Sequence, residues 1–354
     1  MARRAKREDP TDLFLALTPE RVLDAVAAAG LSVRPLCYPL NSFENRVYEV
    51  ELAVAKFYRP QRWTRAQILE EHRFLAEADA EEIPVCPARP FPDGSTLAAI
   101  DGILYAVFDR KGGRAPEELN DATAHRLGML VGRLHVVGAR RPGADRLPLT
   151  SEAYVRRDLA WLAEHGTLPA RLAARYAAAA RAIADAYDRM AAGVELLRVH
   201  GDLHLGNVLE RDGQLRLLDF DDAMIGPAVQ DLWLALPGRE QETDGLVRRF
   251  LEGYEAFRPF PRGELRLIEA LRGLRLIHYA AWLARRWHDP IFPRSWPHFG
   301  SDESWERETN DLEEQAAIVA RVERGLPATQ AADEPGDEPT LTNADLFWDW
   351  EEKG

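Results

Sequence analysis

The segment HGDLHLGNVL, residues 200–209, places an acid and an amide five positions apart in a run that apolar residues flank. A second acid, Asp219, follows in LLDFDDA. Magnesium prefers oxygen ligands and is usually held by one or two carboxylates together with substrate phosphates, so Asn207 and Asp219 suit a metal site. Asp202 would then be left to accept a proton from an attacking hydroxyl. Because aspartate is common in turns, the ordered set favours catalysis more strongly than any one residue does.

A lysine inside an apolar strand pattern marks a second candidate site. Lys56 lies in AVAKFYR, residues 53–59, and a buried lysine is costly unless it has a partner. Lys56 is therefore either an edge-strand lysine that points to solvent or a residue that points to the phosphates of ATP and is held by a carboxylate. Glu70 and Glu71, on the helix expected next in the chain, are both candidates for that carboxylate.

The first third of the chain has the pattern of a small β-rich lobe with one central helix. Alternating and β-branched residues predict strands, and Asp101-Gly102 predicts a hairpin turn. Thr64 suits the N-cap of the central helix, whose apolar residues have helical spacing. In chain order we expect a helix over 19–30, strands over 33–40, 46–52 and 53–59, a helix over 64–80, and strands over 95–101 and 103–110.

The remainder of the chain is mainly helical. We expect long helices over 120–138 and 151–192, a hairpin around Asp212-Gly213, and mostly helices over 227–325. The paired glycines of KGGRAPEEL separate this part from the first. The pattern indicates an α+β, two-lobed chain. Its parts are a lobe with a small antiparallel sheet over residues 1–112, a mainly helical lobe over 113–325, and an acidic tail over 326–354. If the acid, amide and lysine candidates work together, the first lobe would bind ATP and the second would carry catalysis and the acceptor.

Composition narrows the class of protein. The 354 residues are 46% hydrophobic and carry a formal charge of −13, which is unfavourable for a nucleic-acid binder because such proteins need clustered Lys and Arg. No apolar run approaches the roughly 20 residues of a membrane helix, and the basic start MARRAKRED lacks the apolar stretch of a secretory signal. Cys37 and Cys86 match no zinc motif. We expect a cytoplasmic monomer.

The acid, amide and lysine candidates together resemble the active site of the protein-kinase-like fold: Lys56, Glu71, Asp202, Asn207 and Asp219. HGDLHLGNVL is similar to the catalytic loop of the aminoglycoside-phosphotransferase and choline-kinase branch, with Gly201 where eukaryotic protein kinases have an arginine. NSFENRVYEV, AKFYRPQRWTRAQILEEHRFL and DFDDAMIGPAVQDLWL resemble the bacterial stress response kinase A family of serine/threonine protein kinases. The likeness extends from about residue 12 to about residue 325.

This resemblance implies a reaction. Asp202 matches the base that orients or deprotonates the acceptor hydroxyl, and Asn207 and Asp219 match the Mg²⁺ ligands. The implied reaction transfers the γ-phosphate of ATP to a Ser or Thr hydroxyl of a protein substrate. Two alternatives stay open: a small-molecule kinase acting on an aminoglycoside, choline, homoserine or a sugar, and a pseudokinase that binds nucleotide as a scaffold. An intact Asp202 argues against the scaffold, because a binding module needs no base.

The resemblance also implies how ATP is held. Lys56 matches the lysine on the α- and β-phosphates, and the apolar residues that follow Glu71 favour it as the partner, with Glu70 still open. The turn in PLNSFENRVYEV replaces a glycine-rich phosphate loop but has no glycine. Its Ser42 and Asn45 either donate to phosphates or serve ordinary turn chemistry.

Further residues fall at places to which the resemblance gives a role. Phe108 and Asp109 fall at the expected hinge, where main-chain groups would bind adenine. His200 is either a catalytic acid or a core residue that fixes the loop, and Asp231 matches an aspartate that braces it. Asp221 is either a solvated turn residue or a contact of a second metal ion. The tryptophans of RSWPHFGSDESW, Trp296 and Trp305, either pack in the core or line the acceptor site.

Overall fold

The alternating segments of the first part form a five-stranded antiparallel sheet in the order β1-β2-β3-β5-β4. The structure is a computed structural model that describes residues 10–40, 42–236, 238–239 and 243–328. Contacts divide the chain into unit 1, residues 1–113 with 144–146, and unit 2, residues 114–143 with 147–354. The basic start and the acidic tail from residue 329 onwards lie outside the described residues.

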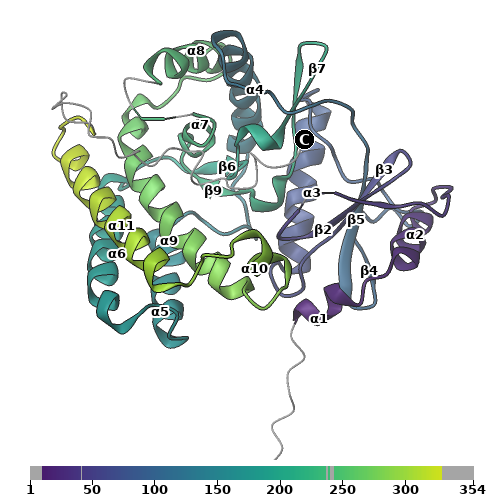
Figure 1. The fold of residues 1–354 in the computed structure, drawn as a ribbon. Coiled ribbons are helices and arrows are strands. Elements are labelled where there is room, and N and C mark those ends of the chain that lie inside the picture. Colours follow the sequence, from purple (N-terminus) through teal and green to yellow (C-terminus); the bar gives the residue numbers. More distant parts are fainter. Residues whose placement is uncertain (1–9, 41, 237, 240–242, 329–354) are drawn as a thin grey trace, which may run out of the picture. The chain divides into compact units, whose positions relative to one another are not determined.

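The described part of unit 1 contains the sheet and three helices (Figure 1). The structure confirms the hairpin at Asp101 and Gly102, where φ values of 49° and 82° suit a tight β-turn. The strand expected over 33–40 is shorter than predicted and begins only at Tyr38. The elements are α1 (Pro10–Leu15), α2 (Pro19–Ala28), β1 (Tyr38–Leu40), β2 (Arg46–Val50), β3 (Ala53–Phe57), α3 (Arg65–Ala80), β4 (Ala98–Ile100) and β5 (Ile103–Asp109).

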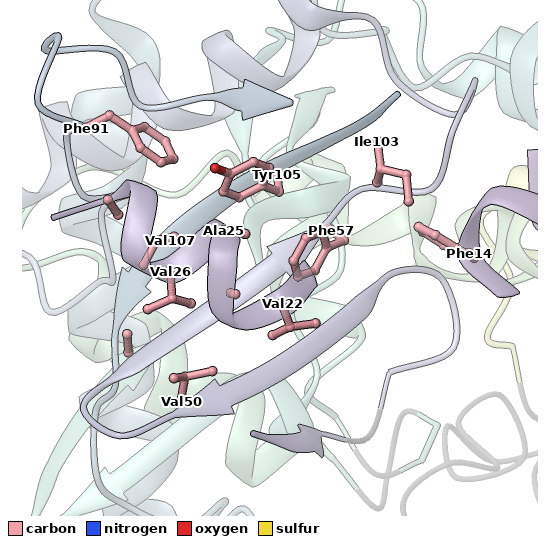
Figure 2. Close-up of a cluster of buried hydrophobic side chains, with 13 residues drawn as sticks. Phe14, Val22, Ala25, Val26, Val50, Phe57, Phe91, Ile103, Tyr105 and Val107 are labelled. Carbon is pink, nitrogen blue, oxygen red and sulfur yellow. The ribbon is translucent and has the colours of Figure 1, made fainter. Parts of the chain in front are cut away.

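One face of the sheet packs against α2. Phe57 of β3 and Tyr105 of β5 stack with ring centroids 5.5 Å apart, and both contribute to the buried cluster that includes Val22 and Val26 of α2 (Figure 2). Burying a side chain of the size of Phe57 contributes about 1.5–3 kcal/mol. Since successive strand residues point to opposite faces, the neighbouring Lys56 points to the other face of the sheet.

The central helix α3 begins where the sequence predicts. The Thr64 hydroxyl accepts a hydrogen bond from the Gln67 N–H at 3.3 Å, and the Gln67 side chain accepts one from the Thr64 N–H at 2.9 Å. This reciprocal cap satisfies two N–H groups that the first helical turn leaves without partners. Ile68 is fully buried against Ala106 of β5 and Tyr58, which follows β3, so the cap and the apolar face together fix the position of α3.

Over the residues that the structure describes, unit 2 is mainly helical, with two small antiparallel pairs, β6 with β9 and β7 with β8. The hairpin predicted at Asp212-Gly213 is confirmed as the β7–β8 turn. Helices α4 and α8 pack closely because Gly128 has no side chain: a Cβ there would lie 1.9 Å from the Phe250 carbonyl oxygen. The elements are α4 (Asp121–Ala139), the π-helical turn η1 (Glu152–Arg156), α5 (Arg157–Glu164), α6 (Ala170–Met190), β6 (Leu197–Val199), β7 (Val208–Arg211), β8 (Gln214–Leu217), β9 (Met224–Gly226), α7 (Gln230–Trp233), α8 (Asp244–Tyr254), α9 (Ile268–Arg286), α10 (Ile291–Ser295), α11 (Asp302–Glu323) and the 3₁₀ helices η2 (Leu205–Asn207), η3 (Phe220–Asp222) and η5 (Arg262–Leu267).

The single helix expected over 151–192 is wrong, because the structure has three helical segments there. Gly166 adopts a φ of 61°, which ends α5, and Pro169 immediately precedes α6. Trp296 and Trp305 are 8% and 1% exposed, as their core interpretation predicts. None of the described helices is both long and apolar enough to cross a membrane.

Candidate active site

Lys56 lies in the middle of the unit 1 sheet. Its strand, β3, pairs with β2 on one side and β5 on the other, so the edge-lysine interpretation is wrong. The Lys56 side chain is buried, with its Nζ 3.6 Å from Glu71 Oε1 on α3 and 5.1 Å from the centre of the Tyr58 ring. A buried ammonium needs such a carboxylate partner, because its charge loses hydration.

The adjacent glutamates of α3 have different contacts. Glu71 binds Lys56 through Oε1 and binds Arg146 through Oε2, which lies 2.8 Å from Arg146 Nη2. Glu70 instead accepts hydrogen bonds from the main-chain N–H groups of Ala144, Asp145 and Arg146. The structure therefore brings Glu71, and not Glu70, to Lys56, and it explains why residues 144–146 belong to unit 1.

Arg146 is a member of this cluster that sequence reasoning missed. It comes 75 residues after Glu71, and no local pattern links the two. Its guanidinium also lies 4.7 Å from the centre of the Trp63 ring. Burial, with smaller effects from the charges of Lys56 and Arg146, lowers the pKa of the neighbouring His72 to about 3, so this histidine is neutral at physiological pH.

The turn between β1 and β2 has its own ion pairs. Asn45 is 2% exposed, and its side-chain oxygen accepts a hydrogen bond from the Arg59 N–H at 3.1 Å. The Glu44 carboxylate lies 3.3 Å from Arg59 Nε and 3.6 Å from Arg62 Nε. Ser42 is half-buried in the same turn. These contacts join the turn to the chain after β3, and the phosphate contacts of Ser42 and Asn45 stay a prediction.

Phe108 and Asp109 end strand β5. The Asp109 carboxylate pairs with Arg89 and with Lys111, and the hydrogen bond from Arg89 lowers the pKa of Asp109 most. The Phe108 ring meets the His72 ring edge-on at 6.2 Å. The side chains of Phe108 and Asp109 therefore have partners within unit 1, and the contact of adenine with main-chain groups here stays a prediction.

Asp231 binds the main chain of the candidate catalytic loop in unit 2. This buried carboxylate accepts hydrogen bonds from the His200 and Gly201 N–H groups at 2.7 and 2.8 Å. It also lies 3.0 Å from His135 Nε2. Burial alone would raise the pKa of Asp231, but the hydrogen bond and charge of His135 hold it below its usual value. Asp231 thus has the bracing contacts that the sequence resemblance implies.

His200 is a core residue of the loop rather than an exposed acid. It is fully buried, and its Nε2 lies 2.6 Å from the Leu218 carbonyl oxygen, to which it can only donate. Its Nδ1 accepts a hydrogen bond from the Asp202 N–H at 3.3 Å. Both ring nitrogens are therefore used to hold the main chain on either side of the loop.

The structure explains why Gly201 stands where eukaryotic protein kinases have an arginine. Its φ is +86°, and a Cβ at this position would lie 2.2 Å from the Asp222 carbonyl oxygen. A side chain would therefore clash with main chain as well as strain the backbone. The glycine allows the segment before Asp202 to lie directly against the segment after Asp219.

Asp202 itself is partly exposed and is held on one side. Its side chain is 23% exposed, and Oδ1 lies 2.9 Å from Nη1 of Arg275 on α9. His204 Nε2 lies 3.6 Å from Oδ2, which is beyond hydrogen-bond distance. Burial alone would raise the pKa of Asp202, but the positive charge of Arg275 holds it below its usual value. The carboxylate is therefore ionised at neutral pH, as a proton acceptor must be.

The proposed metal ligands lie at the same end of the β7–β8 hairpin. The Asn207 side-chain N–H donates to the Asp202 carbonyl oxygen at 2.9 Å, which leaves the side-chain oxygen of Asn207 as the atom available to a cation. The Leu218 N–H donates to the Asn207 carbonyl at 2.8 Å, and Asp219 follows with a strained, left-handed φ of 50°. Carboxylate and amide oxygens suit Mg²⁺, so these residues fit the ion.

One expectation near this hairpin is wrong. Asp221 is only 2% exposed, so its interpretation as a solvated turn residue is wrong, and its contact with a second metal ion stays a prediction. It lies in the 3₁₀ helix η3 beside Phe220, which is buried and packs on the His200 ring with centroids 4.5 Å apart. Burial of this short helix, which the sequence did not reveal, removes Asp221 from solvent.

Comparison with known proteins places this geometry in a family. Residues 37–268 match the family model described as the phosphotransferase enzyme family. The chain is 38% identical over 312 residues to the stress response kinase A of Escherichia coli (strain K12), covering 86% of this chain and 94% of the relative. It has the same identity and coverage with the serine/threonine protein kinase RdoA of Salmonella typhimurium (strain LT2).

Solved structures share the fold at low sequence identity. The amicoumacin kinase hAmiN, in complex with AMP-PNP, Ca²⁺ and Ami, matches with a TM-score of 0.68 and 20% identity, over 90% of this chain and 97% of that one. A microcompartment-associated aminopropanol kinase matches with a TM-score of 0.64 and 22% identity, over 86% and 98% of the two chains. The fold is therefore kinase-like, with an antiparallel sheet in unit 1 and a helical unit 2, and the chain is a kinase that belongs to the phosphotransferase enzyme family and, within it, to the stress response kinase A family.

Proposed function

We propose that this kinase transfers the γ-phosphoryl group of ATP, with Mg²⁺, to a Ser or Thr hydroxyl of a protein. The observation that carries the proposal is the arrangement of the 200–219 segment. It presents the ionised carboxylate of Asp202 to solvent, while main-chain hydrogen bonds hold the loop on which it lies. The relative from Salmonella typhimurium that is named a serine/threonine protein kinase supports a protein acceptor.

Asp202 would act on the acceptor hydroxyl. As the hydroxyl oxygen forms a bond to the γ-phosphorus, the bond from that phosphorus to the β-γ bridging oxygen breaks, and ADP leaves with the electron pair. Asp202 receives the hydroxyl proton and, before that, orients the hydroxyl. Because the reaction requires mainly positioning and charge neutralisation, a rigid loop with an accessible carboxylate is what the chemistry needs.

Asn207 and Asp219 would hold the metal ion through their side-chain oxygens. Mg²⁺, when bound, would neutralise charge on the ATP phosphates. The strained backbone of Asp219 is consistent with this role, because residues in sparsely populated conformations concentrate at functional sites. In unit 1, Lys56 would contact the α- and β-phosphates with its charge fixed by Glu71.

A small-molecule kinase is the second candidate. The observation in its favour is the fold similarity to the amicoumacin and aminopropanol kinases. The same catalytic set serves both kinds of acceptor, because fold does not determine the substrate. A nucleotide-binding scaffold is disfavoured by the intact and accessible Asp202.

The test follows label from γ-labelled ATP with Mg²⁺, using Asp202→Ala as the control. The purified protein is incubated alone, with a generic protein substrate such as casein, and with a panel of small hydroxyl compounds. We expect label on Ser or Thr of protein and its loss in Asp202→Ala. Label on a small compound with none on protein would support the second candidate, and nucleotide binding without any transfer would support the scaffold.

A further inference from the structure

A histidine of unit 2 is held by a buried aspartate close to the proposed base. The side chain of Asp158 on α5 is 3% exposed, and its Oδ2 lies 2.7 Å from Nδ1 of His278 on α9. Because a carboxylate accepts hydrogen bonds, Nδ1 is the ring nitrogen that carries the hydrogen. The His278 side chain is 40% exposed, so Nε2 is the ring nitrogen that remains for a ligand.

The charged groups around this pair already have partners. Oδ1 of Asp158 lies 2.5 Å from Nη2 of Arg285, and Arg275 binds Asp202 at 2.9 Å. Since Arg285 supplies the positive charge that the buried Asp158 needs, the His278 ring does not have to be protonated to hold it. Nε2 then keeps its lone pair and can accept a hydrogen bond. Recognition at this surface would therefore depend on a hydrogen-bond donor rather than on net charge.

Tyr154 links His278 to the catalytic loop. Its ring lies 4.5 Å from the His278 ring, and its Oη lies 3.8 Å from Sδ of Met224. Met224 packs on the loop residue that precedes Asp202, because a Cβ added at Gly201 would lie 2.8 Å from Met224 Cε. Tyr154 is part of the π-helical turn η1, and such turns are rare and frequent at functional sites. Two side chains thus connect His278 with the loop that carries the proposed base.

The position of His278 on α9 gives the same neighbourhood. It follows Arg275 by three positions, and side chains three apart on a helix share one face, with Cβ atoms about 5–6 Å apart. Arg275 binds the Asp202 carboxylate that would receive the hydroxyl proton. An acceptor whose hydroxyl meets Asp202 would therefore bring the atoms next to that hydroxyl toward His278. In a peptide those atoms include main-chain N–H groups, and in an amino alcohol they include the ammonium group.

We propose that His278 binds the acceptor: its Nε2 accepts a hydrogen bond from an N–H group next to the hydroxyl that is phosphorylated. Asp158 is a positioning residue that fixes the hydrogen on Nδ1, and Asp202 remains the base. This role of His278 rests on the proposed function, which it deepens by naming what the acceptor must carry beside its hydroxyl. The main chain of a protein and an amino alcohol both offer that N–H group, and the test separates the two.

The protein arm of the test uses a casein peptide whose Ser becomes labelled from γ-labelled ATP. This peptide is compared with forms N-methylated at that Ser, at the next residue or at a residue four positions away, because N-methylation removes one N–H group. The small-molecule arm compares 1-amino-2-propanol with 1-methoxy-2-propanol, which has a hydroxyl but no N–H group. For each compound, kcat and KM are measured with the unmodified enzyme and its variants.

Three substitutions make the test specific. His278→Phe keeps an aromatic ring but lacks both nitrogens, and His278→Asn keeps an amide that can donate to Asp158 but has no atom in place of Nε2. His165→Phe is the matched control, because His165 is an exposed histidine of the same unit whose Nδ1 lies 2.9 Å from the Trp161 carbonyl oxygen. Thermal unfolding shows whether each variant is folded, and a folded His278→Asn keeps the test valid if His278→Phe does not fold.

With the unmodified enzyme, N-methylation at the Ser or at the next residue should lower kcat/KM about three- to tenfold, mainly through KM, as expected for the loss of one hydrogen bond. N-methylation four positions away should change it less than about twofold. His278→Phe and His278→Asn should raise the KM of the unmethylated peptide, leave the KM for ATP unchanged and lose the preference for the N–H group. His165→Phe should behave like the unmodified enzyme.

Two results would overturn the role of His278 and leave the proposed function intact. One is the same effect of N-methylation on the unmodified enzyme and on the folded His278 variants. The other is a uniformly lower kcat in these variants with an unchanged KM for every acceptor. Label on 1-amino-2-propanol alone, with its preference over 1-methoxy-2-propanol lost in His278→Asn, would support His278 but contradict a protein acceptor. Label on neither kind of compound would contradict the proposed function and, with it, the role of His278.

Discussion

In unit 1 the charged groups of the candidate nucleotide site are buried and neutralise one another. In unit 2 the carboxylates of Asp202 and Asp219 stay accessible, and hydrogen bonds to Asp231 and His200 hold the main chain of the catalytic loop. The side chains of Lys56, Glu71 and Arg146 are 8%, 1% and 3% exposed. That of Asp202 is 23% exposed, and Asp219 is exposed. A buried charge depends on its partner for stability, while an exposed one can be removed with little effect on folding. Substitutions in unit 1 should therefore reduce stability, and those of Asp202 should reduce catalysis.

The largest expected loss of stability follows Glu71→Ala. This change leaves both Lys56 and Arg146 buried without their shared carboxylate, and breaking a buried ion pair costs about 3–5 kcal/mol. Urea unfolding of the purified variant measures the loss. Asp79→Ala, an exposed position on the same helix, is the control and should change the unfolding free energy by at most about 0.5 kcal/mol. Equal effects in the two variants would contradict the comparison between the units.

Arg146→Met should have the next largest effect. It removes the 2.8 Å contact with Glu71 and the interaction with the Trp63 ring, but Glu71 keeps Lys56. A hydrogen bond between charged groups is worth about 1.5–3 kcal/mol, and we expect a loss of stability in that range together with a higher KM for ATP. Arg110→Met, which breaks a half-exposed pair with Glu49, should cost less than about 1 kcal/mol. An unchanged KM would show that Arg146 serves stability alone.

His72 in unit 1 should make stability fall with acid. In the folded chain the pKa of His72 is about 3, below its ordinary value of 6.5. Between those values the unfolded chain binds one proton more, so the stabilisation is complete above pH 6.5 and decreases as the pH falls. From pH 7.5 to 5 the decrease is about 2 kcal/mol. The free energy of unfolding of His72→Gln, measured at pH 7.5 and pH 5, should lack that decrease. The same pH dependence in the variant and in the unmodified chain would contradict the role of His72.

Glu264 in unit 2 should show the opposite sign. Burial raises its pKa from 4.5 to about 7, so the folded chain binds more protons than the unfolded one between those values. Its contribution is complete below pH 4.5 and decreases as the pH rises to 7. The free energy of unfolding of Glu264→Gln, relative to that of the unmodified chain, should therefore be higher at pH 7.5 than at pH 5. A difference that is the same at both pH values would show that burial does not perturb this carboxyl.

The catalytic loop could be predicted from the sequence because its geometry is local. Asp202, Asn207 and the brace between His200 and Asp231 lie within about thirty residues of one another, and hairpin residues bring Asp219 beside Asn207. The helix α3 and the strands around Lys56 were predictable for the same reason, from capping and alternation.

The features that could not be predicted from the sequence depend on contacts between residues that lie far apart in the chain. Arg146 and Arg275 come 75 and 73 residues after the carboxylates that they bind, and arginines are too common for either to be singled out from sequence. The break between α5 and α6 was missed because a helical pattern continues on both sides of Gly166. Burial of Asp221 depends on how η3 packs, which residue type alone does not reveal.

The central claim is that Lys56 in unit 1 serves nucleotide binding and that Asp202 in unit 2 serves phosphoryl transfer. The most direct test measures nucleotide affinity and phosphoryl transfer in Lys56→Met and Asp202→Asn. Titration with a fluorescent ATP analogue gives affinity, and γ-labelled ATP gives transfer. We predict that Asp202→Asn binds nucleotide like the unmodified enzyme but transfers about 10²–10⁴-fold more slowly. Lys56→Met should bind about tenfold more weakly or worse. Loss of nucleotide binding in Asp202→Asn, or unchanged affinity and transfer in Lys56→Met, would contradict the account.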